Sequence, residues 1–160
     1  MRAVAYDSAD AQMLTAEVQM EYARRYGGEG DIAPIDTTEF DAPNGAFLMV
    51  YVDDTPAGMG GWRRHGDASS PLDAEIKRMY VRPAYQRRGL ARALLDEIEE
   101  SAARAGMTRL ILETGSPQPE AVQMYRAAGY EDIPAFGFYA SDPLSVHLGK
   151  LLGADRRVES

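Results

Sequence analysis

Residues 74–105 give the clearest structural signal in the chain, because a strand, a turn and an amphipathic helix follow one another directly. The segment 74–81 has the pattern of a strand, and Pro83 opens the turn that follows it. Between 87 and 105 apolar residues recur at spacings of three or four, which is typical of a helix with one buried face, and Gly106 can end that helix. A strand that leads at once into such a helix predicts a sheet covered by helices.

The remaining segments extend this prediction to a mixed α/β (or α+β) fold. Strands are predicted at 3–6, 46–52, 59–64, 74–81, 110–114, 136–139 and 144–152. Helices are predicted from Ser8 or Asp10 to about residue 25, over 87–105, and from Pro119 to just before Gly129, while 27–40 is loop with one more helical turn. No linker divides the chain, so residues 1–160 are expected to form a single domain.

The strand 74–81 departs from strict alternation. Its apolar residues Ile76, Met79 and Val81 are spaced by three and then by two positions. One extra residue between 76 and 79 explains this spacing, and such an extra residue is a β-bulge. Bulges re-aim backbone groups next to active sites, so the pattern predicts a bulge at a functional position.

Basic residues gather around Gly89 although the chain has a formal net charge of -8. Between 77 and 92 there are six basic residues and no acidic one, namely Lys77, Arg78, Arg82, Arg87, Arg88 and Arg92. Backbone N–H groups at a helix start form an anion site, and pyrophosphate is a common ligand there. Gly89 and the small Ala91 would let such a ligand approach the backbone. The alternative is that Arg87, Arg88 and Arg92 form a solvated helix face.

Composition excludes several kinds of site. The chain has no cysteine, which excludes disulfides, thiolate metal sites and a cysteine nucleophile. Its two histidines, His65 and His147, lie far apart in sequence, so no metal is expected. A pI near 4.8 argues against general nucleic-acid binding. The sequence contains neither a signal peptide nor a run long enough to span a membrane, so a cytoplasmic location is expected.

The segment 86–91, QRRGLA, fits the pattern [RQ]xxGx[GA] through Gln86, Gly89 and Ala91. It follows EIKRMYV and VRP, it precedes the amphipathic helix and LILET, and PEAVQMYRAAGY comes later. Over about 45–149 these motifs resemble the GNAT acyl-CoA N-acyltransferase superfamily. The resemblance implies the GNAT fold: a mixed, mostly antiparallel sheet of about six or seven strands with helices on both faces. In that fold a splayed strand pair holds acetyl-CoA.

The resemblance also implies which residues bind acetyl-CoA. Its pyrophosphate would rest on backbone amides of the signature loop, and its pantetheine arm would pair with the backbone of Met79 and Val81. The amide of Met79 would act as an oxyanion donor. Gln118 stands where the family often has an asparagine, which puts that contact in doubt. The full set is Met79, Tyr80, Val81, Gln86, Arg87, Arg88, Gly89, Leu90, Ala91, Arg92 and Gln118.

Two catalytic residues follow from the same resemblance. Tyr125 occupies the position of the general acid, and a phenol of pKa about 10 can protonate a thiolate whose conjugate acid lies near about 8.5. Helical spacing alone would instead place Tyr125 in the core with Ala121 and Ala128. Glu75 is the candidate base, acting on the amine through water, and the alternative is an ion pair with Lys77.

The acceptor is expected to be a small cationic amine. Nine acidic residues would form one wall of its cleft: Glu17, Glu21, Glu29, Asp31, Asp36, Glu39, Asp41, Asp53 and Asp54. Ordinary surface acidity explains them equally well. Arg78, Trp62, Tyr80 and Tyr139 are candidates for the acceptor pocket or for packing. The alternatives are a protein lysine or N-terminal acetyltransferase, a non-catalytic acyl-CoA sensor, and a nucleotide-binding protein of unrelated fold. A homodimer is left open.

Overall fold

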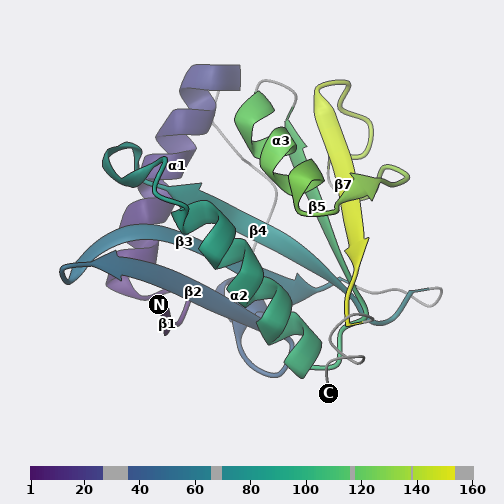
Figure 1. Ribbon diagram of the computed structural model, residues 1–160, viewed down its shortest axis with the longest axis horizontal. Helices are drawn as coiled ribbons and strands as arrows, with labels where there is room; N and C mark the ends of the chain where they lie inside the picture. The colour runs from purple at the N-terminus through teal and green to yellow at the C-terminus, as the bar shows by residue number, and fades with distance from the viewer. Residues whose placement is uncertain (27–35, 66–69, 116–117, 138, 154–160) are drawn as a thin grey trace.

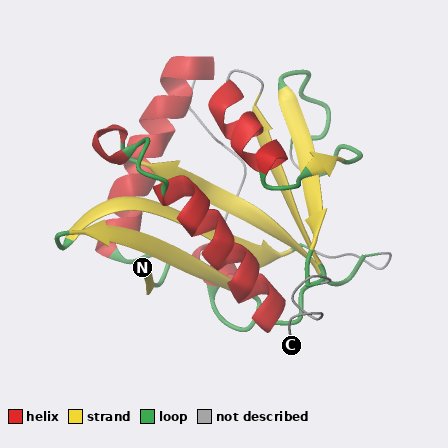
Figure 2. Cartoon of the chain, in the orientation of Figure 1, coloured by secondary structure: helices red, strands yellow, loops and turns green. Residues whose placement is uncertain are grey.

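The computed structural model describes residues 1–26, 36–65, 70–115, 118–137 and 139–153 (Figures 1 and 2). The elements in chain order are β1 (Arg2–Ala3), α1 (Ala9–Tyr26), η1 (Thr37–Phe40), β2 (Gly45–Val52), β3 (Thr55–Arg64), β4 (Asp73–Val81), η2 (Pro83–Tyr85), α2 (Leu90–Arg104), β5 (Arg109–Gly115), α3 (Pro119–Ala127), β6 (Glu131–Asp132) and β7 (Ser145–Leu151). Within these described ranges, no helix has the length and apolar character needed to cross a membrane.

The strands form one sheet of seven in the order β1-β2-β3-β4-β5-β7-β6. Every neighbouring pair is antiparallel except β4 and β5, which are parallel. Their pairing covers only three positions, from Asp73 opposite Arg109 to Glu75 opposite Ile111. Beyond these pairs the two strands separate, as Figure 1 shows. The predicted mixed, mostly antiparallel sheet with a splayed strand pair is confirmed.

Helices cover both faces of the sheet, also as predicted (Figure 1). Alternate residues of β2 show the two layers, because Phe47 and Met49 pack in the core with Leu14 of α1. Leu48 and Val50 pack in the opposite core with α2 and α3. We call these two faces the α1 side and the α2 side.

Helix α2 begins three residues later than the amphipathic pattern predicts. Arg87 and Gly89 have φ values of 64° and 79°, a left-handed conformation that a right-handed helix cannot contain. The helix therefore begins at Leu90, with Gly89 as its N-cap. At the other end Gly106, with φ of 90°, stops it as expected.

The predicted bulge in β4 is confirmed. Lys77 lies opposite Gly61 and Tyr80 lies opposite Met59, so two residues of β4 oppose one of β3. Arg78 is one of these two residues and has φ of 61°. The extra residue places Ile76 and Met79 both on the α2 side.

The predicted strand at 136–139 is wrong where the structure describes it. Phe136 is not in a strand, Tyr139 lies in a turn, and Phe138 lies outside the described residues. The strand that joins the edge of β7 is the earlier β6, with Glu131 opposite Gly149. Pro134 explains the difference, because proline has no N–H to continue a ladder of hydrogen bonds.

Candidate functional site

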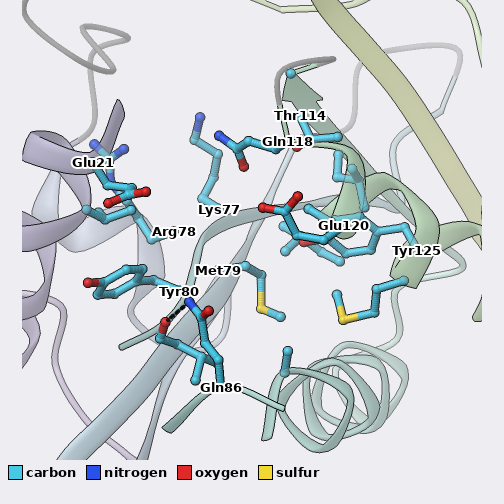
Figure 3. A pocket seen from close by; sticks show the side chains of 18 of the residues that line it. Glu21, Lys77, Arg78, Met79, Tyr80, Gln86, Thr114, Gln118, Glu120 and Tyr125 are labelled. Atoms are coloured by element: carbon cyan, nitrogen blue, oxygen red, sulfur yellow. Dashed lines mark hydrogen bonds between the residues drawn. The ribbon is translucent and has the colours of Figure 1, made fainter. Parts of the chain in front are cut away.

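A cavity of about 1040 Å³ opens where β4 and β5 separate, and we call it the large cavity. Its walls come from 76–81 of β4, 112–115 of β5, the start of α2, and α3, with Glu21 of α1 at one side. Figure 3 shows Lys77 and Met79 of β4 between Glu21 and Tyr125, with Arg78 and Tyr80 on the Glu21 side. The divergence of the two strands therefore creates the main binding space among the described residues.

The start of α2 faces this cavity. Its first N–H groups have no acceptor within the helix, and no side chain caps it at Gly89. A Cβ added to Gly89 would meet no atom within 4 Å, so glycine is required here by its φ of 79° rather than by crowding. The helix start is thus open on the cavity side, and it combines exposed N–H groups with the positive end of the helix dipole.

The basic residues around Gly89 do not all serve the cavity. Arg87 and Arg92 line it, although Arg92 also pairs with Asp96 at 3.1 Å. Arg88 is not among the lining residues, and its guanidinium lies over the ring of Tyr85, 5.5 Å from the centroid.

Arg82 forms an ion pair with Glu17 of α1. Its Nη2 and Nε donate to the carboxylate of Glu17 at 2.8 and 3.1 Å. The hydroxyl of Tyr80 donates to the same carboxylate at 3.2 Å. Burial and the charge of Glu17 raise the pKa of Tyr80 to about 12, so this phenol stays neutral. Tyr80 lines the large cavity and also fastens β4 to α1.

The backbone of β4 points toward the cavity at alternate residues. The N–H of Arg82 donates to the carbonyl of Ala57 on β3 at 2.9 Å. Alternation then turns the backbone groups of Val81 and the carbonyl of Met79 away from β3, toward the opening. The carbonyl of Val81 already accepts from Nε2 of Gln86 at 3.0 Å (Figure 3).

Tyr125 is both a core residue and a cavity residue. It is only 5% exposed, and its ring meets that of Tyr130 edge-on at 5.6 Å between centroids. It nevertheless lines the large cavity, as does Gln118 at the start of α3. Tyr125 is therefore in the core, as helical spacing predicts, and it also borders the cavity, where its role as a general acid stays a prediction.

Glu75 lies outside the lining of the large cavity and beside a second, small cavity of about 60 Å³. Its Oε1 accepts from Nη2 and Nε of Arg63 at 3.0 and 3.2 Å. The same oxygen lies 3.4 Å from Nδ1 of His65. The two cavities share Lys77, Glu113 and Tyr139 as lining residues, so Glu75 is one layer removed from the main space.

The charges around Glu75 stabilise its carboxylate. Burial acts to raise the pKa of Glu75, but hydrogen bonding to His65 and the charges of Lys77 and Arg63 outweigh it and lower that pKa. The hydrogen bond to Glu75 raises the pKa of His65 in turn. Burial lowers the pKa of His147, whose buried Nε2 has no hydrogen-bond partner within the described structure.

The predicted acidic wall is largely absent from the large cavity. Of the nine acidic residues, only Glu21 lines it among those described, and Glu29 and Asp31 lie outside the described residues. Glu39 is bound to Arg63 instead. Trp62 does not line either cavity, because it is buried in the core and donates to Oγ of Ser101 at 3.0 Å.

Arg78 and Tyr139 do line the large cavity. Sequence reasoning missed Glu113, Glu120 and Met124, which also line it. Met124 comes three residues after Ala121, which also lines the cavity, so helical spacing could have found it. Among the described residues, no three histidine, aspartate or glutamate side chains form a cluster that could hold a metal.

Comparison with known proteins assigns this chain and its fold to one family. The sequence profile of the acetyltransferase (GNAT) family matches residues 13–130. The IAA acetyltransferase of Azospirillum brasilense is 33% identical over 129 residues, which cover 77% of this chain and 82% of that protein.

Solved structures agree. A Klebsiella pneumoniae protein assigned as an acyl-CoA N-acyltransferase superposes with a TM-score of 0.76 at 25% identity, over 95% of this chain and 96% of that one. A GNAT acetyltransferase of Elizabethkingia anophelis with acetyl-CoA bound has a TM-score of 0.57 at 16% identity, over 68% and 77% of the two chains. A nucleotide-binding protein of unrelated fold is therefore the wrong interpretation. The chain belongs to the GNAT family of acetyltransferases.

Proposed function

We propose that this protein transfers an acetyl group from acetyl-CoA directly to the primary amine of a small molecule. One observation carries the proposal: the cavity between the splayed strands has an open helix start at one end and Tyr125 in its wall. A site with this pair of features suits an anionic acyl carrier together with a proton donor. Membership of the GNAT family supports the same reaction.

The residues of the large cavity fit acetyl-CoA. Its pyrophosphate would be held by the N–H groups around Gly89 and Leu90, with Arg87 and Arg92 at the side. Its extended arm would lie along β4 beside Met79 and Val81, which both line the cavity. Arg88 would contribute through its backbone only, since its side chain lies over Tyr85.

The reaction breaks the thioester C–S bond while the amide C–N bond forms. The N–H of Met79 would donate to the carbonyl oxygen as negative charge develops on it. Tyr125 would give its proton to the departing sulfur. The attacking amine has to lose a proton. This requires a base on the side of the reacting carbon opposite the departing sulfur.

Glu75 would accept that proton through water. The small cavity of about 60 Å³ has room for about two waters. It shares Lys77, Glu113 and Tyr139 with the large cavity, so these side chains form a common wall across which water would link the two spaces. His65 hydrogen-bonds to Glu75 and is partly exposed, which gives the proton a way out to solvent.

Two measurements test the proposal. Acetyl-CoA should raise the melting temperature, and a panel of small amines should release free thiol from it. Binding without turnover of any amine would favour the non-catalytic sensor. Turnover of peptides with a free lysine or N-terminus, but not of small amines, would favour a protein acetyltransferase. If acetyl-CoA leaves the melting temperature unchanged, both the enzyme and the sensor are excluded.

A further inference from the structure

The bulge in β4 brings two cations to the same side of the sheet. Without the extra residue, Lys77 and Arg78 would point to opposite faces. Lys77 follows Ile76, which packs on the α2 side, and therefore faces the α1 side. Arg78 also faces the α1 side, because its Nε donates to the hydroxyl of Tyr6 in the α1-side core at 3.0 Å. Both residues line the large cavity.

These two cations are buried to an unusual degree. Lys77 is 9% exposed and Arg78 is 8% exposed. Burying a cation is unfavourable unless opposite charge or hydrogen-bond acceptors replace the lost water. Glu75 attracts Lys77 but is itself bonded to Arg63 and His65. A carboxylate from a ligand would add to the partners that the protein already supplies.

The position of the two cations limits where that carboxylate sits in the ligand. Lys77 and Arg78 directly precede Met79, whose N–H we assign to the acetyl carbonyl, and successive Cα atoms lie about 3.8 Å apart. An amine that attacks at Met79 and carries a carboxylate close to its nitrogen would place that carboxylate at the end of the cavity lined by these two side chains. α-Amino acids have this spacing.

Acidic side chains on the same side complete the pattern. Glu113 follows Leu112, which packs on the α2 side, and so faces the α1 side of β5. Glu21 of α1 lines the same cavity. The α1 side thus offers both signs of charge, which suits a ligand with one ammonium and one carboxylate. A polyamine would be repelled by Lys77 and Arg78 beside the reacting carbon.

We propose that the acceptor is an amino acid, or an amine with a carboxylate equally close to its nitrogen, whose carboxylate is bound by Lys77 and Arg78. This inference rests on the proposed acetyl transfer and narrows its acceptor from amines in general to zwitterions. It replaces the cationic acceptor expected from the acidic residues of the first third of the chain.

Matched sets of acceptors test it. Each set contains an amino acid, its amide and the amine formed by its decarboxylation, for every common side chain, and thiol release gives kcat/KM. We expect the amino acid to exceed its two partners by about tenfold or more, because a charge-assisted contact is lost in each of them. Lys77→Gln should bring the three to within about threefold, and Lys77→Arg should keep the preference. Arg64→Gln is the control, since Arg64 is exposed and lines neither cavity.

Equal or better turnover of the amides and amines would overturn the inference while leaving the acetyltransferase intact. So would an absence of turnover for all three kinds of acceptor in a protein whose melting temperature acetyl-CoA raises. Should acetyl-CoA not bind at all, the proposed function fails first and the inference with it. If Lys77→Gln does not fold, the comparison of acceptors with the unmodified protein still decides.

Discussion

Tyr125 is the residue on which the proposed chemistry depends most directly. It is buried and lines the large cavity, so its hydroxyl can act away from bulk water. We expect Tyr125→Phe to lower kcat by about a hundredfold or more and to leave acetyl-CoA affinity near its original value. Steady-state kinetics and a binding titration check the two parts. An unchanged kcat would remove Tyr125 from the mechanism.

Gly89 and Gly106 form a matched pair for testing the helix start. Their φ values are 79° and 90°, and an added Cβ would meet no atom within 4 Å at either position. Alanine at either site should lower the free energy of unfolding by about 1 kcal/mol, because the left-handed conformation disfavours a side chain. Only Gly89 lies at the cavity.

Glutamate substitutions at the same two positions distinguish an effect on acetyl-CoA binding from an effect on stability. Gly89→Glu should abolish acetyl-CoA binding, since it puts negative charge where the phosphates would lie, whereas Gly106→Glu should leave binding unchanged. Calorimetric titration measures both. Retained affinity in Gly89→Glu would contradict the assignment of the helix start.

His65 connects pH to stability. Because its hydrogen bond to Glu75 raises the pKa of His65 above 6.5, the charged pair contributes fully below that value and is lost as pH rises through the raised pKa. Glu75 titrates the other way: its pKa lies below 4.5, so its contribution is lost only in acid. His65→Gln should therefore reduce the free energy of unfolding more at about pH 5.5 than at about pH 8.5. Urea unfolding at the two pH values measures this, and equal losses would show that the pair does not form.

At the scale of elements, a buried polar cluster joins α2, β7 and the end of α3. The hydroxyl of Tyr130 donates to Glu99 at 3.0 Å, and Nζ of Lys150 donates to the other oxygen of Glu99 at 3.0 Å. Tyr130 in turn contacts Tyr125 edge-on. The cluster thus holds the helix that carries the proposed acid against the helix that begins at the anion site.

Removing one hydroxyl tests this cluster. Tyr130→Phe should lower the free energy of unfolding by about 1–3 kcal/mol, because the buried Glu99 then loses the hydrogen bond from this hydroxyl. Glu97→Gln, which affects only an exposed ion pair with Arg104, should change it by less than about 0.5 kcal/mol. Denaturant unfolding compares the two. A Tyr130→Phe loss no larger than that of Glu97→Gln would argue against a stabilising cluster.

The spacing of apolar residues predicted most helices and strands, but it predicted the connections between them less accurately. The spacing of Ile76, Met79 and Val81 predicted the bulge, since a bulge leaves a trace in alternation itself. The same reasoning could not find that α2 begins at Leu90, because left-handed φ at Arg87 depends on how the turn meets the sheet.

For the candidate site too, some features were predictable from the sequence and others were not. Motif resemblance placed Tyr125 and Gly89 at one cavity, and the structure brings them there. It could not show that Glu75 is held by Arg63 and His65 outside the large cavity, since these partners come from the end of β3 and from the residue that follows it. Local pattern identifies backbone features, whereas side-chain partners depend on tertiary packing.

At the scale of the molecule, three residue pairs between β4 and β5 are the only direct strand pairing between the two parts of the described sheet. A ligand that contacts both β4 and β5 should therefore reduce local opening of the part formed by β5, β7 and β6. We expect bound acetyl-CoA to slow amide hydrogen exchange in β5 and α3 more than in β2. Mass spectrometry of exchanged peptides measures this. Uniform protection over the sheet would indicate that the ligand does not bridge the gap.

β4 and β5 separate after only three paired positions. The separation leaves each of the two strands with an edge that faces no neighbouring strand, although the Val81 carbonyl on the β4 edge already accepts from Gln86. A flexible linker with its own amides can dock there in the manner of a missing strand. We therefore expect an acyl donor without those amides to keep its reactive thioester but to bind more weakly, because it could not form hydrogen bonds with the strand edge.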